Sequence, residues 1–253
     1  MSPSAKSNAR STAIDTLRGF AMVWMTVFHF CFDLNQFGYL QANFYSDPLW
    51  TWQRVAIVSL FVWCAGFSQA MAVMQGQPWG RFWKRWRQIA LCALLVSAGS
   101  YALYPQSFIY FGILHGVALM LIVVRVSAHW GRWLWLAGGL AIAMPLIAAY
   151  AHSMSLGVEF LNGKWFNWLG LISRKPVTED YAPLFPWVGV MWWGMAAGQW
   201  CLRARPQWLA DPQTGLLASA SRPLALLGRW SLSYYMLHQP VMIGALMAIA
   251  WLR

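Results

Sequence analysis

The first long apolar segment carries four ionisable side chains whose spacing places them on one face of a helix. Asp15 and Arg18 are three residues apart, which allows an ion pair along a helix. His29 follows Arg18 by eleven residues, close to three turns and about 16 Å of helix rise. Asp33 lies four residues beyond His29, where it can accept an imidazole N–H and fix the tautomer. Because ionisable groups inside a membrane span are costly, these residues indicate a functional site. The alternative is that Arg18 marks a membrane interface and His29 is a packing residue.

Four further ionisable residues fall where apolar side chains are expected. His115 in FGILHG is expected near the middle of a span, and His238 in SLSYYMLHQP near mid-bilayer. Asp180 opens DYAPLFPW, whose prolines keep the backbone extended or broken beside a cavity or protein. Arg54 can extend to the interface, bind a ligand carboxylate or pair with Asp33.

We therefore predict a polar cavity among the first, second, fourth, sixth and seventh spans. For His115 and His238 the alternative is a hydrogen bond to a neighbouring helix. His129 and His152 lie at loop edges, where we expect them to face solvent.

The elements that position these residues are predicted to be membrane-spanning helices. The chain has 253 residues, of which 59% are hydrophobic and only 10% charged, far below the roughly 25% typical of soluble domains. Apolar blocks reach the approximately 20 residues that cross a bilayer. The expected spans are 13–33, 51–74, 86–104, 107–126, 132–151, 182–202 and 230–251. The expected fold is all-α: a seven-span bundle in which residues 1–12 form a cytoplasmic tail and 13–253 a single domain.

The distribution of Lys and Arg predicts the orientation. With the N-terminus in the cytoplasm, five of the eighteen Lys and Arg residues lie outside, which leaves thirteen inside. Those five are Arg54, Lys164, Arg174, Lys175 and Arg253. The asymmetry agrees with the positive-inside rule and places the C-terminus in the periplasm.

Composition also argues against several classes of function. The net charge of +11 is divided among short clusters at helix ends, so it does not predict nucleic-acid binding. The four cysteines stand alone inside apolar blocks, so we expect neither a disulfide framework nor a metal site. The first apolar segment is too long and too polar for a cleavable signal peptide.

Several motifs of the sequence resemble those of a known family. The run AIDTLRGFAMVWMTVFHFCFDLNQFG resembles the opening of bacterial membrane proteins related to the catalytic domain of heparan-α-glucosaminide N-acetyltransferase. FGILHG, DYAPLFPW and SLSYYMLHQP resemble later signatures, in order, between residues 10 and 242. Arg18, ten residues and His29 also resemble the Arg-x10-His element of the wider transmembrane acyltransferase superfamily.

The resemblance implies a multi-pass enzyme of the bacterial inner membrane. It implies transfer of an acetyl group from cytoplasmic acetyl-CoA to an envelope sugar or glycoconjugate on the periplasmic side. His29 is then the general base, Asp33 its orienter and Arg18 a cofactor or structural contact, while His115, Asp180 and His238 match signatures without assigned roles. Direct transfer and an acyl-histidine intermediate both stay open.

The chemistry of the candidate side chains is compatible with this function. Histidine suits the removal of a proton from an attacking hydroxyl or amine. The forked guanidinium groups of Arg81, Arg85 and Arg87, beside Lys84, match the phosphates of CoA, although such a cluster also serves as a plain topology signal. Two rival classes are a small-molecule or lipid transporter, which uses the same buried groups, and a non-catalytic membrane subunit. The acceptor, the acyl chain length and any homo-oligomeric state are not determined by the sequence.

Overall fold

The computed structural model describes residues 11–209 and 216–252, and this part of the chain is built from helices. The eight α-helices are α1 (Thr12–Gln36), α2 (Pro48–Met74), α3 (Trp79–Leu103), α4 (Ile113–Val126), α5 (Trp133–Ser153), α6 (Leu184–Ala204), α7 (Leu216–Arg229) and α8 (Ser231–Trp251). Four short 3-10 helices accompany them: η1 (Ser127–Trp130), η2 (Glu159–Asn162), η3 (Asn167–Leu169) and η4 (Pro206–Leu209). The predicted all-α class is confirmed.

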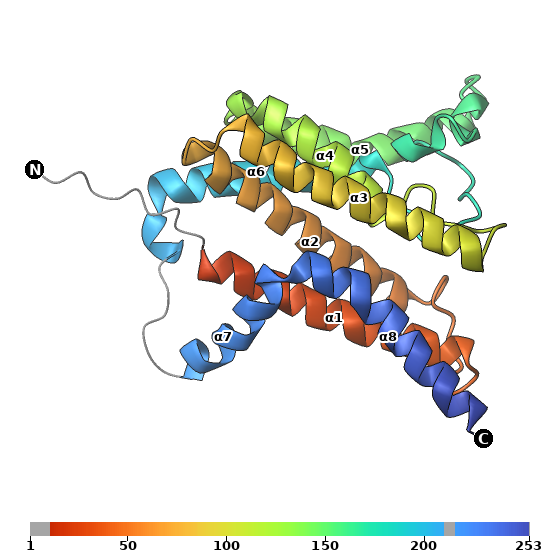
Figure 1. Ribbon diagram of the computed structural model, residues 1–253. Helices are drawn as coiled ribbons and strands as arrows, with labels where there is room; N and C mark the ends of the chain where they lie inside the picture. Colours follow the sequence, from red (N-terminus) through yellow and green to blue (C-terminus); the bar gives the residue numbers. More distant parts are fainter. Residues whose placement is uncertain (1–10, 210–215, 253) are drawn as a thin grey trace, which may run out of the picture.

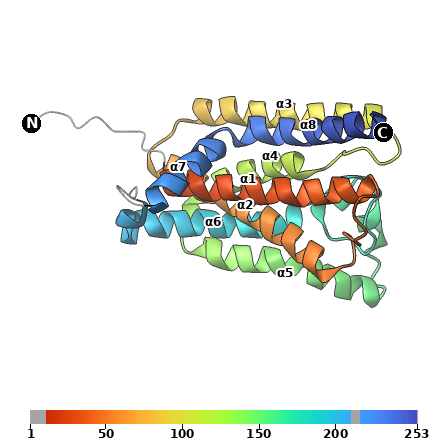
Figure 2. The same cartoon turned by 90° about the horizontal axis from the view of Figure 1, so that it is seen from below.

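The long helices lie roughly along one common direction, so the bundle has two ends (Figure 1). We call the end where α1 begins the proximal end, and the end where α8 finishes the distal end. Figure 2 shows the same bundle from below, with α7 crossing the proximal half of α1. The connections 37–47, 104–112 and 154–183 therefore gather at the distal end.

Five helical segments of the described chain are long and apolar enough to cross a membrane. They are α1, α2, α4 continued through η1, α5 and α8. The chain is thus a multi-pass membrane protein. α3 is not in this set, because its first turns hold Arg81, Lys84, Arg85 and Arg87. α6 also falls outside it, although it lies within the same bundle; its tryptophans and glycines score low on a hydropathy scale.

Several helix boundaries differ from the sequence prediction; α3, for example, begins at Trp79, seven residues before the expected span 86–104. The fourth span was expected over 107–126, but α4 begins at Ile113, and residues 104–112 form an irregular connection. The connection expected over 203–229 contains the 14-residue helix α7, which holds Pro223 in its interior. Helix α7 is too short to span a bilayer on its own, and it packs against α1 instead.

Glycines allow the central helices to pack closely. A Cβ atom on Gly66 of α2 would lie 2.0 Å from the carbonyl oxygen of Met191, and one on Gly194 of α6 would lie 2.2 Å from that of Trp63. The same relation holds between α1 and α7, where a Cβ on Gly19 would lie 1.9 Å from the carbonyl oxygen of Leu224. Small residues permit such approaches between membrane helices, where van der Waals packing drives association.

Candidate active site and its two ends

A cavity of about 490 Å³ lies between α1, α2, α3, α4 and α8 and reaches the proximal end of the bundle; we call it the inner cavity. Arg18, Arg81 and Arg85 contribute to its lining. Apolar side chains such as Phe61, Leu114 and Val117 also line it. The lining therefore combines cations with an apolar wall. Arg87, on the same helix as Arg81 and Arg85, is exposed and is not a lining residue.

The guanidinium group of Arg18 is fixed by three neighbours. Its Nη1 donates to the Asp15 carboxylate at 2.9 Å and to the Gly228 carbonyl at 3.3 Å, while its Nη2 donates to the Ser68 hydroxyl at 2.6 Å. The predicted ion pair between Asp15 and Arg18 is therefore confirmed. Arg229 approaches the second oxygen of Asp15 at 3.6 Å, so two cations surround this buried carboxylate. Arg18 thus links α1, α2 and the end of α7 beside the inner cavity.

Aromatic and imidazole rings continue from the inner cavity towards the distal end. Tyr235 lines the cavity, and its ring centroid lies 5.7 Å from that of His238. The His238 ring stacks on Tyr234 at 5.8 Å and meets the His29 ring edge-on at 5.4 Å. We call these four residues the ring cluster. It links the cavity to His29, which does not itself line the cavity.

Hydrogen bonds fix the orientation of the ring cluster. Nδ1 of His238 lies 2.8 Å from the carbonyl oxygen of Tyr235, so Nδ1 carries the proton and donates it. Its Nε2 is then left as an acceptor, buried and without a hydrogen-bond partner among the described residues. The Tyr234 hydroxyl contacts the Thr26 hydroxyl at 2.6 Å, which ties α8 to α1. An imidazole nitrogen with a free lone pair is the group that a proton-transfer site requires.

Asp33 does not orient His29 as the sequence predicted. Its Oδ1 accepts a hydrogen bond from the Gln239 side chain at 3.0 Å, and its buried Oδ2 has no partner within the described residues. The ring of His29 packs instead on Phe28 and His238. Spacing along α1 allowed the Asp33–His29 contact, but the neighbouring helix α8 offers Asp33 an amide donor. Arg54, which was also considered as a partner for Asp33, is exposed near the start of α2.

His115 lies in the first turn of α4 rather than near the middle of a span. Its Nδ1 accepts the Gly112 backbone N–H at 3.3 Å, and its Nε2 lies 3.1 Å from the Ser97 hydroxyl. Asp180 lies at the same helix end, where one carboxylate oxygen accepts the Ile113 N–H at 2.8 Å. Both residues satisfy free N–H groups at the start of α4. These contacts join α3, α4 and the segment before α6.

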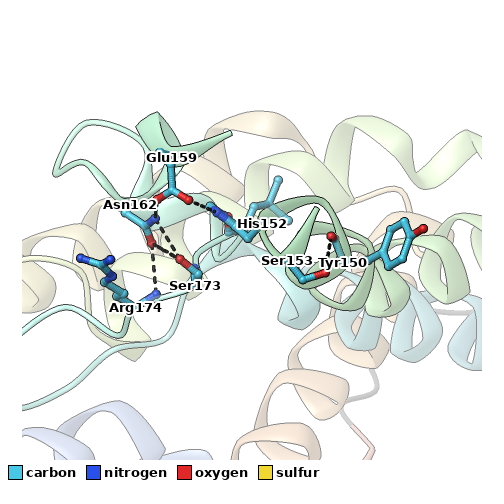
Figure 3. Close-up of polar contacts among 8 residues, drawn as sticks. Tyr150, His152, Ser153, Glu159, Asn162, Ser173 and Arg174 are labelled. Atoms are coloured by element: carbon cyan, nitrogen blue, oxygen red, sulfur yellow. Dashed lines mark hydrogen bonds and ion pairs between the residues drawn. The ribbon is translucent and has the colours of Figure 1, made fainter. Parts of the chain in front are cut away.

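His152 was expected to face solvent, but it is buried at the end of α5. Figure 3 shows it beside Glu159, with 3.5 Å between the imidazole Nδ1 and the carboxylate. Its Nε2 lies 3.1 Å from the Leu171 carbonyl. The long connection 154–183 folds back over the end of α5, and this covers His152. The exposed position predicted for His129 is confirmed.

The ten predicted site residues thus fall into separate groups. Arg18, Arg81 and Arg85 line the inner cavity; His29, His238 and Asp33 lie at the α1–α8 contact; His115 and Asp180 hold the start of α4; Arg54 and Arg87 are exposed. The inner cavity differs from the polar cavity predicted among the first, second, fourth, sixth and seventh spans, because α3 lines it and α6 does not.

Sequence reasoning missed Tyr235, Ser68 and Gln239. Tyr235 connects the cavity with His238, Ser68 holds Arg18, and Gln239 binds Asp33. The three-residue spacing of Tyr235 and His238 in SYYMLHQP places both on one helix face and could have identified Tyr235. Ser68 and Gln239 carry no comparable signal, because their roles depend on a neighbouring helix. All four cysteines are free, and the described residues hold no group of three or more potential metal ligands.

The fold and the site define a multi-pass helical membrane protein with a basic cavity that leads through Tyr235 to His238 and His29. Over residues 10–240 the sequence matches the family of the catalytic domain of heparan-alpha-glucosaminide N-acetyltransferase, and the chain belongs to this family. Membership implies acyltransferase activity. Comparisons with curated proteins and with solved structures return no significant match.

Proposed function

We propose that the protein is a membrane acetyltransferase that binds acetyl-CoA in the inner cavity and passes the acetyl group to a sugar-type acceptor from the other side of the bilayer. The observation that carries this proposal is the position of the inner cavity. It combines three arginines with an apolar wall and ends at Tyr235, beside His238 and His29.

The lining fits the two parts of acetyl-CoA. Arg81 and Arg85 suit the phosphates, because guanidinium groups donate two hydrogen bonds to an oxyanion. The apolar wall suits the uncharged arm that carries the thioester. Arg18 is held by Asp15 and Ser68 within the same lining, so it acts as a fixed contact along this arm. Arg87 adds to the positive potential at the proximal end.

His29 is the proposed general base. It accepts the proton of the acceptor hydroxyl or amine while that oxygen or nitrogen bonds to the thioester carbonyl carbon. The carbon–sulfur bond then breaks, and the CoA thiolate leaves and takes up a proton. Direct transfer requires both substrates beside the ring cluster at once. His238, with its free Nε2, is suited to hold His29 or to share its proton.

The proposed topology has seven spans, namely α1 to α6 and α8, in a bacterial inner membrane. The proximal end, with Arg81, Lys84, Arg85 and Arg87, faces the cytoplasm in this arrangement. The distal connections face the periplasm. Such an orientation presents the inner cavity to the compartment that contains acetyl-CoA.

The test uses purified full-length protein in lipid nanodiscs, with acetyl-CoA labelled in the acetyl group. We expect saturable acetyl-CoA binding and label transfer to a panel of envelope sugars. His29→Ala should abolish transfer and retain binding, whereas His129→Ala, at an exposed histidine, should behave as wild type. Folded protein that binds no acetyl-CoA would overturn the proposal. Sugar flux in vesicles without any CoA requirement would then favour a transporter.

A further inference from the structure

The part of the inner cavity that lies furthest from the proximal end has a different lining from its mouth. On α2, α4 and α8 the lining residues furthest from the proximal end are Phe61, Leu114 and Tyr235. We call this part of the cavity the apex. Arg81, by contrast, lies in the first turn of α3, at the proximal end. A CoA molecule with its phosphates at the arginines would therefore extend its thioester towards the apex.

Tyr235 supplies the polar side chain of the apex. Phe61 and Leu114 are apolar, and the Tyr235 hydroxyl forms no hydrogen bond within the described part of the chain. This hydroxyl is also absent from the set of fully buried oxygen atoms that lack a partner, so it is accessible. The neighbouring Tyr234 differs, because its hydroxyl is bonded to that of Thr26 and its side chain does not line the cavity. The Tyr235 O–H is therefore free to donate to a ligand in the cavity.

The ring of Tyr235 is held in place by packing on two sides. It contacts two apolar clusters, one that includes Val117 and another that includes Met25, and Phe61 packs against the same two clusters. The backbone carbonyl of Tyr235 also accepts the Nδ1–H of His238, one turn further along α8. A donor that is fixed before the reaction stabilises charge that develops in a transition state, because it needs no reorganisation.

Other polar groups close to the ring cluster do not offer such a donor. Both Nη atoms of Arg18 already donate to acceptors on α1, α2 and α7. His238 donates through Nδ1 to a backbone carbonyl, which leaves its Nε2 as an acceptor. His29 must accept a proton if it is the general base. The Tyr235 hydroxyl therefore complements the two histidines, since it can supply a hydrogen bond to an oxygen atom while they accept protons.

We propose that the Tyr235 hydroxyl donates a hydrogen bond to the carbonyl oxygen of the acetyl thioester and to the oxyanion that forms from it. This inference rests on the proposed function and assigns a further catalytic residue to it. The acceptor oxygen or nitrogen bonds to the carbonyl carbon, its proton passes to His29, and the π electron pair moves onto the oxygen that Tyr235 binds. When the carbonyl forms again, the carbon–sulfur bond breaks and the CoA thiolate takes the proton from His29. Tyr235 keeps its own proton throughout.

The test uses two ligands that cannot transfer an acetyl group, titrated into the full-length protein in lipid nanodiscs. The first is the ketone analogue of acetyl-CoA, in which CH₂ replaces the sulfur atom, and the second is the same molecule with CH₂ in place of the carbonyl group. We expect wild type to bind the ketone up to about tenfold more tightly, as for one added hydrogen bond. Tyr235→Phe should remove most of this preference. Tyr150→Phe, which removes an exposed hydroxyl on α5, is the matched control and should retain it.

Two further readouts separate a hydrogen bond from a packing role. With an isotope label at the carbonyl carbon, the infrared stretching frequency of the bound ketone should be lower in wild type than in Tyr235→Phe, because a hydrogen bond weakens the carbonyl bond. In turnover of acetyl-CoA, Tyr235→Phe should lower kcat by about 10²-fold, the effect of one lost oxyanion donor. This loss should exceed the loss in ketone affinity, because the hydrogen bond strengthens as negative charge forms.

The outcomes distinguish this inference from the proposed function. An equal preference for the ketone in wild type and Tyr235→Phe, or an equal carbonyl frequency in the two proteins, would overturn the role of Tyr235. If such a variant still transfers acetyl groups at the wild-type rate, the proposed function stands without it. Folded wild type that binds neither analogue nor acetyl-CoA would overturn the proposed function, and the role of Tyr235 with it.

Discussion

The imidazole rings of His29 and His238 meet across the contact of α1 with α8, with centroids 5.4 Å apart and planes inclined by 61°. One turn further along α1, Asp33 binds Gln239, the neighbour of His238. A ring contact and a hydrogen bond, one helical turn apart, therefore join α8 to α1. The proposed base is held by a second histidine from the last helix, whereas sequence spacing had suggested an acid from its own helix.

This relationship predicts a strong effect of His238 on catalysis. His238→Phe keeps a ring against His29 and Tyr234 but removes the nitrogen that lacks a partner. We expect kcat for acetyl transfer to fall by about 10²-fold, within the range for loss of a group that assists proton transfer, with acetyl-CoA affinity unchanged. Steady-state kinetics with isothermal titration measures both. Full activity in His238→Phe would reduce the role of His238 to packing.

The inner cavity predicts a difference between arginines on one helix. Arg81→Gln and Arg85→Gln each remove a cation from the cavity lining, so we expect acetyl-CoA to bind about tenfold more weakly to each variant. Arg87→Gln removes an exposed cation outside the lining and should change affinity by less than about twofold. Titration at two salt concentrations checks this. Equal losses in all three variants would indicate an effect of net charge alone.

The close approach of α2 to α6 predicts the effect of adding one methyl group. In Gly194→Ala the new Cβ would lie 2.2 Å from the Trp63 carbonyl oxygen, so the helices must separate. We expect a loss of stability of about 1–3 kcal/mol, as for overpacked cores, and a lower Tm in detergent. Gly99→Ala in α3 meets nothing within 4 Å and should be neutral or slightly stabilising, because alanine favours helix. A Tm unchanged in Gly194→Ala would contradict the packing described.

The burial of Asp180 at the start of α4 predicts a pH dependence. Burial raises the pKa of Asp180 above its ordinary value of 3.8, so the folded state favours the protonated form. Its contribution to stability is then complete below pH 3.8 and is lost as the pH rises through the raised pKa. Asp180→Asn keeps an oxygen for the Ile113 N–H and does not titrate. We expect the Tm of this variant to decline less with rising pH than the Tm of wild type. Parallel curves of Tm against pH for the two proteins would contradict this prediction.

Asn162 is predicted to hold the segment before Lys175. Asn162→Ala leaves the N–H groups of Ser173 and Arg174 without their acceptor. Each lost hydrogen bond contributes about 0.5–1.5 kcal/mol, so hydrogen exchange at these two amides should accelerate by roughly tenfold. Exchange mass spectrometry measures this, and peptides from α2 and α6 are the internal control. Unchanged exchange at 173–175 would show that the segment is held by other contacts.

The sequence by itself determined the features that depend on order along one helix or on composition. Apolar blocks of about 20 residues predicted an all-α membrane protein, because a helix of this length crosses a bilayer with its backbone polar groups paired within the segment. The three-residue spacing predicted the Asp15–Arg18 ion pair, because residues three apart are neighbours on the surface of a helix. The motifs from Arg18 to His238 indicated the family that the match over residues 10–240 then identified.

Only the tertiary structure decided which helix face meets which neighbour. The spacing along α1 allowed a contact of Asp33 with His29, but Asp33 binds Gln239 of α8 instead. His115 lies at the start of α4, where it contacts Gly112 and Ser97. Arg81 and Arg87 look equivalent in sequence, yet only Arg81 lines the inner cavity. The physical reason is that these contacts join residues far apart along the chain. The close approach of α2 to α6 at Gly66 and Gly194 is likewise a tertiary contact that no local pattern encodes.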